Sequence, residues 1–325
     1  MNKARWTYCL AAALLAASIG AQAQSWPQKP VRIVIAYAAG GTTDLVARAF
    51  APHYQRAWSQ PVIIDNRPGA GGHLAAEQVA KSPGDGYTLL LTSTGGQAAG
   101  PALYRKLSYE PVKDLVGVAS LGWSSNIMVV NPAVAATSLS EFVALAKRTP
   151  GKLYYGSSGV GSGPQFGFEM LKAAASIDVV HVPYKGDAPL QAALVANEVQ
   201  AAIVVPNSVL AQIRAGKLRP LASTGTTRLS VLPDVPTMAE SGYPSVQYAP
   251  AVGLYAPAST PREIVSRINA ETVKAIQDPE MVKTNMPRWG LDPEVLSAEA
   301  FHARYVNDVE TFRRVVRDAK IPLID

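Results

Sequence analysis

The stretch "VIAYAAGGTTDLVARAF" (Val34–Phe50) changes character halfway along its length. The apolar residues up to Tyr37 are typical of a strand, whereas the pattern from Asp44 onward is typical of a helix with one apolar face. The glycine pair 40–41 lets the backbone turn sharply between the two, with no Cβ in the way. The sequence therefore predicts a strand, a tight turn and a helix, the building unit of an α/β protein.

Three roles are open to this turn. The helix after it presents unpaired N–H groups and the positive end of its dipole, which favours a bound anion. Asp44 could be a catalytic carboxylate, and Thr42, Thr43 and Asp44 are all good helix caps. No catalytic partner for Asp44 stands out in the sequence. Ligand binding and helix capping therefore remain the main alternatives.

Strand-like and helix-like segments alternate along the rest of the chain, which predicts largely parallel sheets. The expected strands are 31–37, 62–64, 87–92, 115–121, 127–130, 153–155, 181–184, 201–205, 221–224 and 252–255. The expected helices include 44–58, 73–81, 207–215 and 298–318, together with one that Ser138 caps. We expect residues 93–96 to form a polar loop. The block 126–250 is compositionally complete as one domain, and residues 251–325 are expected to rejoin residues 24–125.

The first 23 residues have the pattern of a signal peptide. A short positive region with Lys3 and Arg5 precedes the apolar stretch 10–19, and Ala21-Gln22-Ala23 supplies a cleavage pattern. The only cysteine, Cys9, lies in this leader, so the exported chain would hold no disulfide or thiolate metal site. We expect a periplasmic protein if the source is Gram-negative.

Composition excludes several classes of protein. Loss of the leader lowers the formal charge from +6 to +4, and the remaining Lys and Arg residues do not cluster as in a nucleic-acid binder. No later segment has the ~20 apolar residues that a membrane span needs. The four histidines, His53, His73, His181 and His302, lack metal-ligand spacing, so we expect no metal and no cofactor. His73 follows a glycine-rich turn and is either a cleft residue or a surface residue at a helix start.

A second strand–loop–helix junction stands at "YGSSGVGSGPQFGFEM" (Tyr155–Met170). It lacks the Gly-Lys-Ser/Thr of a phosphate loop and the third glycine of a dinucleotide site. It is also no nucleophile elbow, because Val160 stands where the last glycine of Gly-x-Ser-x-Gly belongs. A flexible polar loop is the alternative to a ligand-binding role.

Three more polar loops follow expected strands, at 93–94, 184–186 and 206–208. In open α/β sheets, ligands bind outside the carboxyl ends of the strands. Together the five loops predict a cleft that hydrogen-bonds a small polar molecule, with Tyr37 and Tyr184 shaping its walls. A different hypothesis is a secreted hydrolase that uses Ser158 or Ser162, although no motif supplies a base.

Taken together, seven ordered motifs resemble the Bordetella uptake gene (Bug) family, the periplasmic solute receptors of tripartite tricarboxylate transporters. The motifs are "WPQKPVRIVIAYAAGGTTDLVAR", "IDNRPGAGG", "GDGYTLLL", "YGSSGVGS", "VPYKG", "AGKLRPLA" and "LPDVPTMAESG". The resemblance implies a type II periplasmic binding protein, in which two α/β domains enclose a hinged cleft and two segments cross between them. It also implies a monomer without enzymatic activity that delivers its ligand to the membrane subunits of a transporter. A sensor that reports its ligand to a membrane-bound regulator is the alternative.

The resemblance also implies where the ligand binds. Members of the family hold the carboxylate of a small organic acid between two loops, which correspond here to residues 38–44 and 156–162. Ser93 and Asn207 match further polar positions around the cleft. The predicted ligand-binding residues are Tyr37, Ala39, Gly40, Gly41, Thr42, Thr43, Asp44, Ser93, Ser157, Ser158, Gly159, Ser162, Tyr184 and Asn207.

Overall fold

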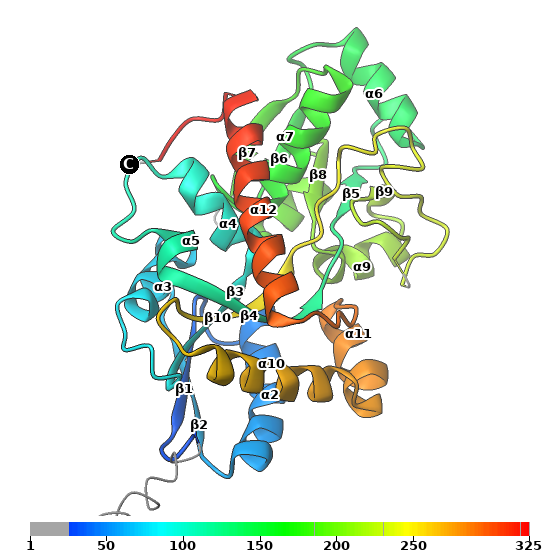
Figure 1. The fold of residues 1–325 in the computed structure, drawn as a ribbon. Coiled ribbons are helices and arrows are strands. Elements are labelled where there is room, and N and C mark those ends of the chain that lie inside the picture. The colour runs from blue at the N-terminus through cyan, green and yellow to red at the C-terminus, as the bar shows by residue number, and fades with distance from the viewer. Residues whose placement is uncertain (1–25, 185, 230, 319, 325) are drawn as a thin grey trace, which may run out of the picture.

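A computed structural model describes residues 26–184, 186–229, 231–318 and 320–324. The expected leader, residues 1–23, lies outside the described residues. The chain forms two five-stranded sheets with helices on both faces of each (Figure 1). Within the described residues, no helix is both long and apolar enough to span a membrane.

The first sheet has the strand order β2-β1-β3-β10-β4. Its strands are β1 (Val31–Ile35), β2 (Val62–Asn66), β3 (Thr88–Ser93), β4 (Leu115–Trp123) and β10 (Ala251–Pro257). β1 pairs in parallel with β2 and β3, whereas β10 runs antiparallel between β3 and β4. Strands β1 to β4 come from the N-terminal part of the chain, whereas β10 follows all strands of the second sheet in the sequence.

Helices cover both faces of the first sheet. One face carries α2 (Thr42–Trp58) and α10 (Arg262–Ile276), and the other carries α3 (His73–Ala80), α4 (Thr94–Leu103) and α12 (Ala298–Asp318). Short turns of helix lie at η1 (Ala70–Gly72), α5 (Pro111–Asp114), η2 (Met281–Asn285) and α11 (Met286–Trp289).

Side chains of β1 explain this layering. Ile33 and Ile35 point into the core under α2 and α10, while Val34 and Ala36 point into the core under α3, α4 and α12. Successive side chains of a strand alternate between the faces, so a strand that is apolar at every position needs cover on both sides. Each such Val or Ile contributes about 1.5–3 kcal/mol by its burial.

The second sheet has the strand order β7-β6-β8-β5-β9. Its strands are β5 (Ile127–Val130), β6 (Tyr154–Ser157), β7 (Val180–Pro183), β8 (Ala201–Val204) and β9 (Arg219–Ser223). Helices α6 (Leu139–Arg148) and α7 (Gly163–Ala175) cover one face, and α8 (Asp187–Val195) and α9 (Pro206–Arg214) cover the other. β5 is antiparallel to both of its neighbours.

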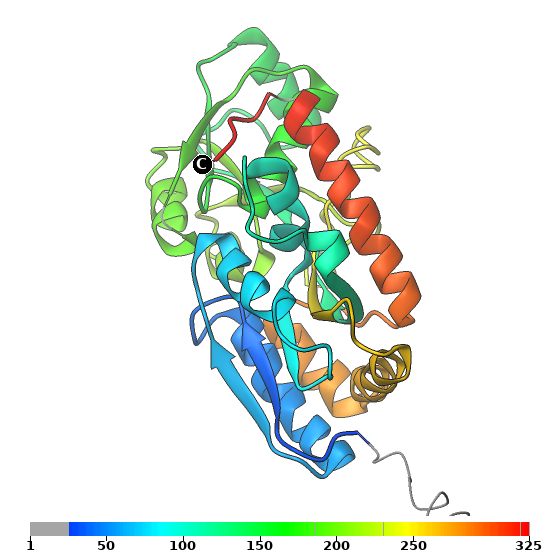
Figure 2. The ribbon, with the colours of Figure 1, turned by 60° about the vertical axis from the view of Figure 1, so that its left-hand side comes forward.

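Two adjacent segments connect the sheets. Residues 124–126 lead from β4 to β5, and residues 248–250 return the chain to β10. The amide of Ser124 donates to the carbonyl of Pro250 over 2.9 Å, so the two crossover segments are hydrogen-bonded to each other. Beside them, α12 lies along both halves of the molecule (Figures 1 and 2), and its Phe312 ring packs 4.5 Å from Phe166 of α7.

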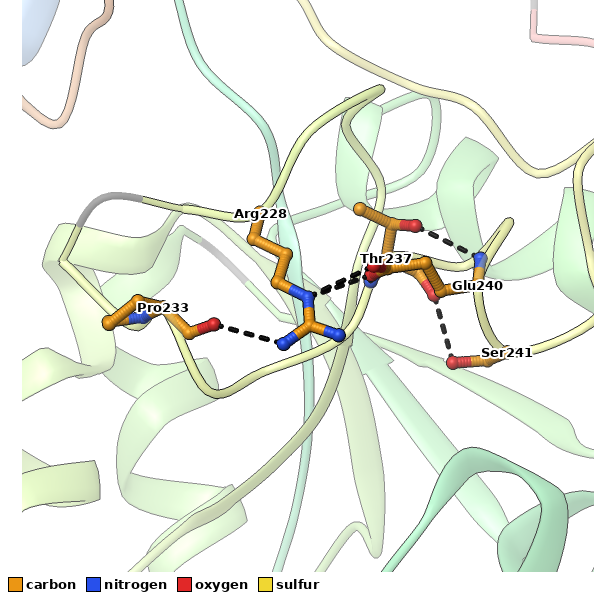
Figure 3. Close-up of polar contacts among 5 residues, drawn as sticks. All are labelled: Arg228, Pro233, Thr237, Glu240 and Ser241. Carbon is orange, nitrogen blue, oxygen red and sulfur yellow. Dashed lines mark hydrogen bonds and ion pairs between the residues drawn. The ribbon is translucent and has the colours of Figure 1, made fainter.

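The proline-rich segment between β9 and the return crossover is held by a polar cluster (Figure 3). Arg228 Nε contacts both carboxylate oxygens of Glu240, at 3.1 and 3.0 Å. Glu240 also accepts from the amide of Thr237 over 2.7 Å, and its own amide donates to the Thr237 hydroxyl over 3.0 Å. This reciprocal pair is the arrangement of a capping box, here fixing an irregular loop instead of a helix.

The structure corrects one expectation about secondary structure. Residues 93–96 are not a loop, because α4 begins at Thr94 directly after β3. The expectation of largely parallel sheets is confirmed, with one antiparallel strand in each sheet, β10 in the first and β5 in the second. The cap at Ser138 is confirmed, since its hydroxyl accepts from the amide of Glu141 over 3.2 Å.

Candidate ligand-binding cleft

The first strand–helix junction joins β1 to α2. Gly40 has a φ of +85°, in the left-handed region that favours glycine. The N-cap of α2 is Gly41, and no side chain caps it. The expected cap at Asp44 is therefore wrong. The glycine pair lets the chain enter helical geometry at Thr42, which places Asp44 inside the first turn.

Asp44 instead stabilises the loop between β1 and α2 through hydrogen bonds of its side chain. Its side chain is buried, and its Oδ2 accepts from the amide of Gly40 over 2.9 Å and from Arg48 Nε over 3.0 Å. Asn66 Nδ2 donates to Oδ1 over 3.1 Å. Burial raises the pKa of Asp44, but the hydrogen bonds from Arg48, Gly40 and Asn66 outweigh it and hold the pKa below the usual range. The carboxylate is thus ionised and fully engaged.

The amides at the start of α2 remain for a ligand. The first backbone bond of the helix runs from Leu45 N to the carbonyl of Gly41, so the N–H groups of Thr42 and Thr43 precede it. Both threonines line a cleft. A helix N-terminus with free amides attracts anions, because the N–H groups and the dipole act together.

The second junction joins β6 to α7 and has the same form. Gly159 and Gly161 have φ values of +140° and +79°. Ser162 is the N-cap of α7, and its hydroxyl accepts from the amide of Gln165 over 3.5 Å. Gln165 Oε1 reaches back and accepts from the amide of Gly161 over 2.7 Å. The helix again begins next to the cleft, where the amide of Gly163 precedes Pro164, which has no N–H.

Ser157 lies behind this loop and does not line the cleft. It is fully buried, with its hydroxyl 2.7 Å from His181 Nε2 and 3.0 Å from the carbonyl oxygen of Gly159. Gln165 Nε2 lies 3.3 Å from the other ring nitrogen of His181. Burial lowers the pKa of His181. This neutral network fixes the shape of the loop.

All these elements open on one cleft of about 500 Å³, a volume typical of small-molecule sites. Eight of the predicted residues line it, namely Tyr37, Gly41, Thr42, Thr43, Ser93, Ser158, Gly159 and Ser162. The structure places the other six outside the lining: Ala39, Gly40, Asp44, Ser157, Tyr184 and Asn207.

Tyr184 and Asn207 have structural contacts instead. Tyr184 packs against the core under α8 and α9. Asn207 Nδ2 donates to the carbonyl of Arg288 over 2.9 Å, which joins α9 of the second sheet to α11 beside the first. His73 is buried, with Nδ1 2.8 Å from the Tyr109 hydroxyl, so it is neither a cleft residue nor a surface residue. Its burial lowers its pKa to about 4.

Several residues that line the cleft were not among the predicted ones. They are Gly71, Gly96, Ser124, Asn126, Asp187, Tyr248, Trp289 and Leu291. Most come from the crossover segments or from the C-terminal part that returns to the first sheet. Asn126 is buried, and its amide oxygen has no hydrogen-bond partner among the described residues. Asp187 alone could have been found, as an acid that opens a helix after one of the predicted loops.

Tyr248 sits between the starts of two helices. A Cβ built on Gly95 of α4 or on Gly163 of α7 would lie 2.0 Å from its hydroxyl oxygen. Only glycine leaves room for this ring at both places. The tyrosine therefore brings α4, α7 and the return crossover together at the back of the cleft.

Charge in the cleft is sparse. Among the described residues that line it, Asp187 is the only one with a charged side chain. The lining otherwise offers hydroxyls, amides and two helix N-termini. A second cavity of about 420 Å³ lies on the other side of the crossover segments, where Arg304 pairs with Glu294 and Asp308. Among the described residues that line this cavity, no glycine of a strand–helix junction has a φ above zero, so the first cleft is the better candidate.

Two α/β sheets, paired crossovers and a polar cleft at the carboxyl ends of the strands define the class of periplasmic binding proteins. Residues 46–320 match the family described as the tripartite tricarboxylate transporter family receptor. The chain belongs to this family. It is 32% identical to protein BugT of Bordetella pertussis over 321 residues, covering 98% of each chain.

Solved structures show the same fold. One is an R. palustris protein solved with adipate, at a TM-score of 0.80 and 30% identity over 92% of this chain and 100% of that one. Another is MatC from Rhodopseudomonas palustris with bound malate, at a TM-score of 0.75 and 31% identity over 90% of this chain and 100% of that one.

Proposed function

We propose that this chain is a periplasmic solute receptor that captures a small carboxylate-containing molecule and delivers it to the membrane subunits of a tripartite tricarboxylate-type transporter. One lobe would comprise residues 24–125 with 251–325, and the other residues 126–250. Residues 1–23 would direct export and be removed. The receptor acts as a monomer and performs no covalent chemistry.

The convergence of two helix N-termini on one cleft is the observation that carries this proposal. The starts of α2 and α7 both line the cleft, and each loop is braced by a side chain from the following helix turn. Amides that are already oriented bind a carboxylate through charge-assisted hydrogen bonds without further ordering. The complexes of two relatives, with adipate and with malate, support a carboxylate as the ligand.

Closure of the two lobes would let a transporter recognise the ligand-bound receptor. The two adjacent crossover segments form a short connection about which the lobes can rotate. A carboxylate that contacts both α2 and α7 binds the closed form more tightly than the open one, and so shifts the equilibrium toward closure. A dissociation constant of ~1 μM would need roughly −8 kcal/mol, within reach of several such hydrogen bonds.

The contacts of the serines argue against a hydrolase. Ser157 is paired with His181, but it is fully buried behind the loop and does not line the cleft. Ser158 does line the cleft, yet among the described residues no histidine is hydrogen-bonded to its hydroxyl. Ser162 serves as a helix cap. Among the described residues, the one serine paired with a histidine is therefore not accessible from the cleft.

A thermal-shift screen tests the proposal. The protein without residues 1–23 would be heated with a panel of small mono-, di- and tricarboxylates, with neutral sugars as controls. A true ligand at 100 times its dissociation constant adds about 2.7 kcal/mol to the free energy of unfolding. The proposal predicts that at least one carboxylate raises the melting temperature. It is wrong if only uncharged solutes do so.

A further inference from the structure

The side chain of Asn207 reaches from one half of the molecule to the other. Asn207 is the second residue of α9, and its Nδ2 donates to the carbonyl of Arg288 in α11 over 2.9 Å (Figure 1). α9 packs on the second sheet through Val209, whereas α11 packs on the core of the first sheet through Met286. The hydrogen bond therefore joins the two halves at a place other than the crossover segments.

The helix that carries Asn207 does not need this contact. Asparagine is a common cap at helix starts, but among the described residues no side chain caps α9. The hydroxyl of the next residue, Ser208, donates to the carbonyl of Val205 over 2.7 Å. Asn207 is exposed and does not line the cleft. Neither the capping of α9 nor a contact with a ligand accounts for the direction of its side chain.

The carbonyl of Arg288 does need a donor. The last carbonyls of a helix have no partner within the helix. The amides of Leu291 and Asp292 follow the end of α11, but they donate to the carbonyls of Met286 and Trp123, over 3.0 and 2.8 Å. The carbonyl of Arg288 accepts from the second half of the molecule instead.

Gly290 lets the two segments approach closely. A Cβ built on Gly290 would lie 2.9 Å from each of Cγ, Oδ1 and Nδ2 of Asn207. The φ of Gly290 is +66°, in the left-handed region that favours glycine. Trp289, which stands between Arg288 and Gly290, lines the cleft. The amide group of Asn207 thus contacts the chain on both sides of a cleft residue.

We propose that Asn207 is a positioning residue for ligand capture: its contact with residues 288–290 forms when the lobes close, and it holds the Trp289 wall of the cleft against the second lobe. This inference rests on the proposed receptor function and adds a residue that controls how long a ligand stays bound. Each of the two helices is fixed to its own lobe, so rotation about the crossover segments separates α9 from α11. A bond that is made only in the closed form shifts the equilibrium toward closure and slows release of the ligand.

Ligand release from Asn207→Ala tests the inference. The probe is the carboxylate that the wild-type protein binds most tightly among malate, succinate, adipate and the rest of the thermal-shift panel. Titration calorimetry gives the dissociation constant, and stopped-flow tryptophan fluorescence gives the two rate constants. We expect affinity to fall about 3- to 10-fold, the range for one hydrogen bond, with faster release and a nearly unchanged association rate. Gln212→Ala, the matched control, removes an amide side chain from the same helix outside the cleft lining and should leave release unchanged.

Two further variants separate closure from folding. Asn207→Asp keeps the shape of the side chain but cannot donate to a carbonyl, and an acid at a helix start favours the helix. Release should therefore be faster, while the ligand-free protein keeps its melting temperature. Gly290→Ala should also weaken binding, because its Cβ would overlap the amide group of Asn207. That loss should be smaller when Asn207 is already alanine, since the overlapping atoms are then gone.

The outcomes separate the inference from the proposed function. The inference is wrong and the receptor function stands if Asn207→Ala releases the probe at the wild-type rate, or if Gln212→Ala speeds release by the same factor. Independent effects of Asn207→Ala and Gly290→Ala on affinity would overturn the inference as well. If no carboxylate of the panel binds to the wild-type protein, the receptor function itself fails.

Discussion

The two junctions of the cleft share one construction and differ in charge. In the first, Asp44 reaches back four residues to the amide of Gly40, and in the second, Gln165 reaches back four residues to the amide of Gly161. Asp44 is an ionised carboxylate that Arg48 compensates. Gln165 is neutral and contacts the ring of His181.

This comparison shows how a loop can be rigid and still offer free amides. The bracing side chain satisfies one glycine N–H in each loop. The amides of Thr42 and Thr43 in the first junction and of Gly163 in the second then remain for a ligand, whereas Pro164 has no N–H and the amide of Gln165 donates to Ser162. Because one brace is charged and the other is neutral, the two loops should respond differently to substitution and to acid.

Loss of Asp44, the charged side chain that holds the first loop, should have the largest effect on the free energy of unfolding. Asp44→Ala leaves the amide of Gly40 without its acceptor and removes one of the two acceptors of the Asn66 side chain, which keeps the carbonyl of Tyr37. It also removes the partner of Arg48, and we expect a loss of roughly 2–4 kcal/mol in the free energy of unfolding. Urea denaturation at pH 7 measures it. The folded-state pKa of Asp44 is lowered, so its stabilisation is present above the unfolded value of 3.8 and is lost as the pH falls through the folded value. An unchanged midpoint at pH 7 would contradict this role.

Replacing the glycines at the two helix starts by alanine should change stability by very different amounts. A Cβ at Gly163 meets the Tyr248 hydroxyl at 2.0 Å, whereas one at Gly41 meets only the Ala38 carbonyl oxygen at 3.6 Å. Gly163→Ala should therefore cost about 1–3 kcal/mol of stability. Gly41→Ala, the matched control, should cost less than about 1 kcal/mol. Equal losses in the two variants would mean that Tyr248 does not hold the helices together.

Removal of Gln165, the neutral side chain that holds the second loop, should lower the free energy of unfolding less than removal of Asp44. Gln165→Leu leaves the amide of Gly161 without an acceptor, and we expect a loss of about 1–2 kcal/mol in the free energy of unfolding. Affinity for the ligand should also fall, because the loop 158–162 must then be ordered on binding. A loss larger than that of Asp44→Ala would reverse the comparison.

Acid should weaken the second junction before the first. Burial lowers the pKa of His181 from 6.5, so the unfolded chain takes up a proton first and stability declines as the pH falls from 6.5 through the folded value. His181→Asn should lose less melting temperature than the wild-type protein between pH 7 and pH 5. The pKa values of His73 and His302 are lowered in both proteins, so their contribution cancels. A His181 titration midpoint above 6.5 by NMR would overturn this prediction.

Local patterns predicted the elements that local forces determine. The run from Val34 to Phe50 gave its strand, turn and helix because alternation and a glycine pair are visible in sequence. The helix α4 was missed because Gly95 and Gly96 have low helix propensity. Those glycines are needed for tertiary reasons, since a Cβ on Gly95 would meet Tyr248 and one on Gly96 would meet Tyr37.

The cleft was predictable only in part, for a similar reason. Thr42 begins the helix after β1, Ser93 ends β3 and Ser158 follows β6 directly. The carboxyl ends of parallel strands meet at one edge of a sheet. Asn126 and Tyr248 lie in the crossover segments, and Trp289 comes from the C-terminal part. Their places depend on how the two sheets face each other, which no local pattern encodes.

The most direct test of the two-loop account is a crystal structure of the protein with the carboxylate that gives the largest thermal shift. The account predicts that the carboxylate oxygens lie within hydrogen-bond distance of backbone amides at Thr42 or Thr43 and of groups in residues 158–163. A ligand bound in the cavity beside Arg304, or a carboxylate held by a side-chain cation instead of these amides, would contradict it.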